Sequence, residues 1–121
     1  MPFIEFKSNR KITEEQQVLL RESIGRILEV IPGETREFTV YTFQDEMRIN
    51  FSLSNPDQPC VYVSVEVFDK IMETVDHKIL KAFLRGATEI VYTVLQTPPE
   101  NTFVYFTTLP MMAWDEANLV G

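Results

Sequence analysis

The sequence contains one cysteine and one histidine, and this shortage excludes several kinds of site. Cys60 has no partner for an internal disulfide, and its position at the head of a β-branched stretch favours a buried, inert thiol. One histidine, His77, is too few for a zinc site of several His and Cys ligands or for a recognisable Ser-His-Asp or Cys-His arrangement. Glycine-rich phosphate loops and the G-x-S-x-G turn are also missing. We therefore expect any chemistry to use no metal and no other cofactor.

Basic residues are scarce as well. The 11 Lys and Arg against 18 Asp and Glu give a formal net charge of −7, and no basic cluster stands out that could neutralise a run of phosphates. We expect neither nucleic acid nor a membrane as a partner. No apolar run approaches the ~20 residues of a membrane helix, and the N-terminus lacks the pattern of a signal peptide. The expected location is therefore the cytoplasm.

What the chain does have is enough apolar material for one core. Of its 121 residues 45% are hydrophobic, which is typical of a single domain spanning residues 1–121.

The first half of the sequence predicts a strand, a helix and a second strand. Residues 2–6 form a short alternating apolar stretch, and Thr13 followed by Gln16 is a capping-box pattern that starts a helix. Pro32-Gly33 is expected to end that helix, and residues 38–43 are rich in β-branched and aromatic residues. A further alternation indicates a half-exposed strand or ribbon at Met47, Ile49, Phe51 and Leu53.

The second half repeats this order. Residues 60–67 are the strongest strand pattern in the chain, and an amphipathic stretch predicts a helix from about Asp76 to Leu95. Residues 97–101 break that helix, and residues 102–107 give the last strand.

The two halves, about 1–55 and 59–121, indicate a duplicated β-α-β unit, and each starts at a proline, Pro2 or Pro59. Chance similarity between turn residues could produce part of this match. Two right-handed crossovers predict an α+β fold, a two-layer α/β arrangement with a four-stranded mixed sheet and both helices on one face. Because the strands carry apolar residues on both sides, we expect a homo-oligomer to cover the other face.

Several short motifs, in this order and spacing, resemble the tautomerase superfamily along nearly the whole chain. They are Met1-Pro2 leading into the first strand, Pro59-Cys-Val-Tyr-Val-Ser-Val65, Pro99-Glu-Asn-Thr-Phe-Val104 and Trp114. The similarity is to the long members: macrophage migration inhibitory factor-like proteins, bacterial phenylpyruvate tautomerases and malonate semialdehyde decarboxylase. It implies a homotrimer whose three sheets line a central barrel, and a proline exposed by removal of the initiator methionine as the central residue.

In this chain the implied catalytic residue is Pro2, after loss of Met1. A terminal proline is a secondary amine whose ring fixes φ, so that its nitrogen is held in place. An α-amino group titrates near ~8, and apolar surroundings would favour its neutral form. Such a base can remove a proton α to a carbonyl and return it elsewhere, which is keto-enol tautomerisation. The alternative is an ordinary proline at the start of a strand.

The chain departs from the family at the groups that would hold a substrate anion. The lysine of cytokine-type members falls near Glu34, two residues before Arg36, and the two arginines of the decarboxylase correspond to Phe68-Asp-Lys70, where only Lys70 matches. The C-x-x-C pair of cytokine-type members is absent. The resemblance implies these substrate-binding candidates: Arg36, Phe68, Lys70, Phe103, Tyr105 and Trp114. Surface charge or ordinary packing is the competing interpretation of each.

Three functions follow from this pattern. The first is an isomerase acting on a small α-keto or enol acid, with Pro2 as general base. The second is a decarboxylase or hydratase that uses protonated Pro2 as an acid, and the third is a non-enzymatic trimeric binding protein on the same scaffold.

Overall fold

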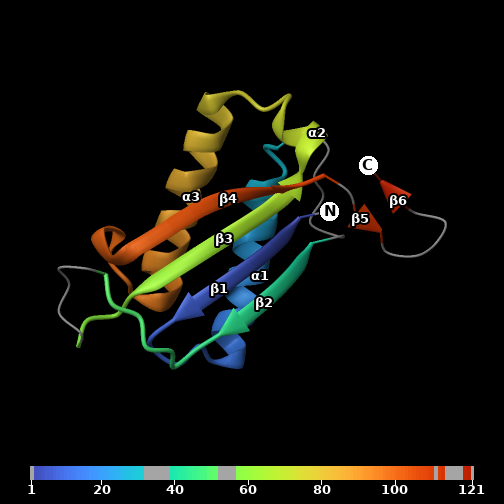
Figure 1. The fold of residues 1–121 in the computed structure, drawn as a ribbon. Helices are drawn as coiled ribbons and strands as arrows, with labels where there is room; N and C mark the ends of the chain where they lie inside the picture. Colours follow the sequence, from blue (N-terminus) through green and yellow to red (C-terminus); the bar gives the residue numbers. More distant parts are fainter. Residues whose placement is uncertain (1, 32–38, 52–56, 111, 114–118, 121) are drawn as a thin grey trace.

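The computed structural model describes residues 2–31, 39–51, 57–110, 112–113 and 119–120. Its main sheet has four strands in the order β2-β1-β3-β4: β1 (Phe3–Ser8), β2 (Val40–Gln44), β3 (Val61–Phe68) and β4 (Thr102–Leu109). The two long helices, α1 (Glu14–Leu28) and α3 (His77–Leu95), cover one face of this sheet and leave the other face open (Figure 1). The predicted α+β fold is confirmed.

Each half of the chain makes the same parallel connection. Strand β1 is parallel to β2 across α1, β3 is parallel to β4 across α3, and the central pair β1–β3 is antiparallel. Such a mixed sheet is the arrangement expected from two β-α-β crossovers side by side.

The helix boundaries follow from their caps. The Thr13 hydroxyl accepts the Gln16 N–H at 3.2 Å, and the Gln16 side-chain oxygen accepts the Thr13 N–H at 2.9 Å, so that the predicted capping box is present. The side chain of Asp76 caps α3 by accepting the Lys78 N–H at 2.6 Å. Helix α1 ends at Leu28, and Pro32-Gly33 lies outside the described residues.

The core lies between the sheet and the two helices. Alternate strand residues such as Phe6, Val63 and Val65 are fully or almost fully buried, and they meet Leu20 and Phe83 from the helices. The alternation of β1 and the four valines of β3 thus predicts their buried faces correctly. No helix among the described residues is both long and apolar enough to span a bilayer.

Three features differ from the sequence-based expectation. Residues 47–51 are not in a strand, and the Met47 N–H donates to the Ser8 carbonyl at 3.0 Å, just past the end of the β1–β2 pairing. Leu53 lies outside the described residues. Short elements that the sequence did not indicate are the helices α2 (Asp69–Met72) and η2 (Pro99–Asn101), and a second sheet of β5 (Met112–Ala113) and β6 (Leu119–Val120).

The open face is aromatic and charged, not apolar throughout. Phe103 on β4 is 58% exposed and Tyr105 is 36% exposed, while Lys7 pairs with Glu5 at 3.0 Å and lies 5.2 Å from the Tyr62 ring centroid. The pairing registers arrange this face in three rows across β2, β1, β3 and β4: Val40, Phe3, Glu66, Thr107; Thr42, Glu5, Ser64, Tyr105; and Gln44, Lys7, Tyr62, Phe103.

Candidate functional site

Pro2 lies at the start of the central strand β1. It is buried, and its carbonyl oxygen accepts the Val40 N–H from β2 at 3.0 Å. On the other side, the antiparallel register pairs Phe3 with Glu66, so Pro2 lies at the level of Val67 near the end of β3. The backbone on both sides therefore sets the position of the proline ring.

The end of β3 has two buried apolar residues near this level, and a lysine follows it in α2. Val67 is fully buried and Phe68 is 6% exposed. Two residues further on, in α2, Lys70 is exposed, and its Nζ lies 6.0 Å from the centroid of the Phe68 ring. Pro2, Phe68 and Lys70 thus lie at one end of the sheet, where β1 begins and β3 ends.

Phe103 and Tyr105 lie elsewhere in the same subunit. Phe103 is aligned with Tyr62 on β3, which is aligned with Lys7 on β1. Lys7 is five residues from Pro2, which corresponds to about 17 Å along the strand. Both aromatic residues are on the open face and partly exposed, so a single subunit does not bring them to Pro2.

Arg36 and Trp114 lie outside the described residues, as does Glu34 at the position of the family lysine. Of the two cations predicted to bind the substrate anion, Arg36 and Lys70, the structure therefore describes the position of Lys70.

Within the described residues, a carboxylate on β3 stands close to the level of Pro2. Glu66 stands opposite Phe3, one residue from the level of the proline, and its negative charge would favour a protonated amine. The burial of Pro2 works in the opposite direction, because an ammonium ion would lose hydration there. Sequence reasoning missed Glu66 because strand alternation gives its face but not its cross-strand neighbour.

Metal chemistry has no ready ligand set in this part of the molecule. Across the described ranges, no three His, Cys, Asp or Glu side chains come together in a group that could hold an ion.

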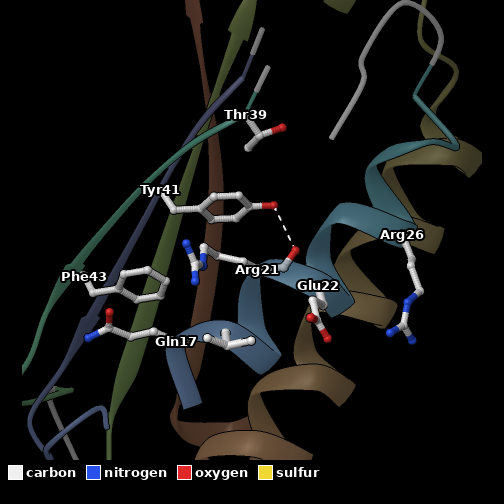
Figure 2. A pocket seen from close by; sticks show the side chains of 8 residues that line it. Gln17, Arg21, Glu22, Arg26, Thr39, Tyr41 and Phe43 are labelled. Carbon is white, nitrogen blue, oxygen red and sulfur yellow. Dashed lines mark hydrogen bonds between the residues drawn. The ribbon is translucent and has the colours of Figure 1, made fainter. Parts of the chain in front are cut away.

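A concave region lies between α1 and β2. This open α1–β2 groove has a volume of about 970 Å³ (Figure 2). Sequence reasoning missed it, although spacing at i and i+4 on the helix and alternation on the strand were visible. Its lining residues are Gln17, Val18, Arg21, Glu22, Arg26, Thr39, Tyr41 and Phe43.

A tyrosine bridges this groove. The Tyr41 hydroxyl donates to the backbone carbonyl of Arg21 at 3.3 Å. Burial raises the pKa of Tyr41 above its ordinary value of 10.0, against the opposing effects of a hydrogen bond with Thr39 and the positive charge of Arg21. The hydroxyl is thus neutral and hydrogen-bonded at physiological pH.

The fold places the chain in a defined structural class. No protein-family model matches the sequence, and no curated protein matches it significantly. Solved structures do match: MIF2 of Leishmania major has 20% sequence identity and a TM-score of 0.81, covering 95% of this chain and 94% of that one. A macrophage migration inhibitory factor homologue from Prochlorococcus marinus has 17% identity and a TM-score of 0.78, with 98% and 99% covered.

A third similar structure is macrophage migration inhibitory factor from Toxoplasma gondii, with 13% identity, a TM-score of 0.72 and coverage of 88% and 89%. The chain therefore has the fold of these macrophage migration inhibitory factor structures. The resemblance in sequence motifs is confirmed at the level of this fold.

Proposed function

We propose that this protein is a tautomerase-like isomerase that moves a proton between carbon and oxygen in a small α-keto or enol acid. The supporting observation is the position of Pro2, buried at the first residue before the central strand, with its carbonyl bound to Val40. Removal of Met1 would turn its nitrogen into a free secondary amine at that point, in the cytoplasm and without a cofactor.

In the proposed reaction, the neutral nitrogen of Pro2 takes the proton from the carbon α to the carbonyl. The electron pair of that C–H bond forms the C=C bond of the enol, and negative charge develops on the carbonyl oxygen. The proton then returns to this oxygen, so that no atom is gained or lost. A buried amine is suited to this role because its neutral form is favoured near the working pH.

The acid group of the substrate requires a cation. We assign this role to Lys70 or Arg36, and the support for Lys70 is its exposed ammonium group close to Phe68 at the end of β3. Phe68 and Trp114 would provide apolar contacts to the substrate. A cation at this position would also stabilise the developing enolate.

We further propose a homotrimer. The open face, with Phe103 58% exposed, favours burial against another copy. About 17 Å of strand separates the levels of Phe103 and Pro2, and about 10 Å separates those of Tyr105 and Pro2. Because β4 also lies two strands away from β1, we expect both rings to reach Pro2 only from a neighbouring subunit.

The test is a tautomerase assay on protein whose mass shows that it starts at Pro2, with a panel of phenylpyruvate-like substrates. Pro2→Ala should lower kcat by about 100-fold or more, since a positioned base contributes roughly that much. Pro59→Ala is the matched control at the start of the second half and should leave kcat unchanged. Equal activity of Pro2→Ala and the parent protein on every substrate would refute the proposal.

A binding protein without catalytic activity is the second candidate. The observation that favours it is Glu34, an acid at the position where cytokine-type members carry lysine. A proline-directed electrophile distinguishes the two: failure to label the mature N-terminus supports the binding protein.

A decarboxylase or hydratase with protonated Pro2 is the third candidate, and release of carbon dioxide from a 3-oxo acid would identify the decarboxylase.

A further inference from the structure

The α1–β2 groove is separate from the proposed chemistry at Pro2. Of the groove residues on the strand side, Thr39 is nearest to Pro2, because it precedes Val40. Tyr41 and Phe43 lie further along β2, away from Pro2. Their side chains point toward α1 because they alternate with the outward-facing Val40 and Thr42. The groove is therefore lined by α1 and β2 and does not include Pro2.

The helix wall of the groove carries a cation, Arg21, beside the aromatic rings of β2. Arg21 points its guanidinium group toward the rings of Tyr41 and Phe43, whereas Arg26 points away from β2 (Figure 2). Within the part of the chain that the structure describes, Arg21 forms no ion pair with a carboxylate. Among the described lining residues, Glu22 is the carboxylate on the same wall as Arg21 and Arg26. Arg21 thus presents its guanidinium group beside the aromatic rings, in a chain of net charge −7.

The strand side of the groove is a flat aromatic surface. The rings of Tyr41 and Phe43 are nearly parallel, with centroids 6.4 Å apart and an interplanar angle of 10°. Phe6 lies behind Phe43 in the core at 5.4 Å and 9°, which holds the Phe43 ring in place. The hydrogen bond from Tyr41 to the Arg21 carbonyl ties the strand to the helix at this level. A surface of this kind is preorganised to stack with a planar ring.

We propose that the α1–β2 groove binds a small planar aromatic carboxylate. The carboxylate accepts two N–H bonds from the Arg21 guanidinium, whose fork matches its two oxygens. The ring lies against Tyr41 and Phe43. The groove volume of about 970 Å³ is ample for a single-ring acid, and the Arg21 guanidinium, which points toward the rings, suits a carboxylate.

Benzoate is the probe, followed by NMR chemical shifts of the backbone amides on full-length protein. Saturable shifts should be largest at residues 17–26 and 39–43. Benzamide, which keeps the ring without the charge, and acetate, which keeps the charge without the ring, should each bind at least about tenfold more weakly. Binding should also weaken as salt is added, because the Arg21 contact is partly exposed to solvent.

Arg21→Gln should weaken benzoate binding about tenfold or more, the effect of losing one charge-assisted pair. Arg85→Gln removes an exposed arginine from α3, away from the groove, and should leave the affinity unchanged. Equal losses in the two variants would mean that net charge alone attracts the probe, and the proposal would then be wrong. Shifts absent from the groove, or confined to the open face, would also overturn it.

The groove and the proposed catalytic site can be tested independently. Benzoate should bind Pro2→Ala protein with unchanged affinity at the groove, whether or not that variant has lost isomerase activity. If Pro2→Ala abolishes the shifts at residues 17–26, the probe reads the Pro2 site and the groove proposal fails. If the isomerase assay is negative but the groove binds benzoate, only the proposed function fails.

Discussion

The exposed ring of Phe103 offers a quantitative test of the proposed assembly. A phenylalanine side chain buries roughly 200 Å² when fully covered, so its 58% exposure leaves about 115 Å² in contact with water. At about 25 cal/mol per Å², covering this area would stabilise the assembly by roughly 3 kcal/mol per subunit. That free energy corresponds to about 100-fold in the association constant per contact.

The change is Phe103→Thr, which keeps a β-branched residue in the strand while removing the ring. The matched control is Tyr92→Gln on α3, because Tyr92 is 57% exposed and glutamine suits a helix. Both variants lose a similarly exposed aromatic ring, but Tyr92 is on the helical layer. Sedimentation equilibrium over a range of concentrations should show dissociation of Phe103→Thr where the parent protein and Tyr92→Gln remain assembled.

An unchanged association constant for Phe103→Thr would refute the assignment of the open face as the contact surface. Dissociation of Tyr92→Gln instead would move the contact to the helical face. A parent protein that stays monomeric at every concentration would contradict the homotrimer itself.

Two further predictions concern stability. Thr13→Ala should lower the free energy of unfolding, measured by urea denaturation, by about 1 kcal/mol, because the Gln16 N–H loses its acceptor. Thr13→Ser keeps a hydroxyl and should lower it much less. Equal losses in the two variants would show that the cap does not stabilise α1. The raised pKa of Tyr41 means that folding favours its neutral form, so stability should be fully present below about pH 10 and fall as the pH rises through the folded-state pKa. Tyr41→Phe should flatten that fall in urea titrations at a series of alkaline pH values, and an equally steep fall in the variant would contradict the assignment.

Local patterns carried most of the information about the elements. The capping box at Thr13 and Gln16, the valines of β3 and the amphipathic residues of α3 all predicted structures that depend on neighbours in the chain. The alternation at residues 47–51 shows the limit of this reasoning, because alternation alone does not provide a strand to pair with. The Met47 N–H donates to the Ser8 carbonyl just past the β1–β2 pairing, and residues 47–51 form no strand in the single chain.

The candidate site depended more on tertiary structure. The family resemblance singled out Pro2, Phe68 and Lys70, and the sheet brings these three to one end; the same register keeps Phe103 and Tyr105 away from Pro2 in the subunit. The groove with Arg21 could not be predicted, because it combines residues of α1 and β2 whose relative placement is set by packing.

The sequence by itself thus determined the order of strands and helices, their buried faces and the candidate proline, since propensity, caps and periodicity act over a few residues. Only the tertiary structure decided which strands are neighbours, in which register, and hence that Glu66 stands near Pro2 and Arg21 near Tyr41. These contacts join segments far apart in the chain, and they arise from burial of the whole core.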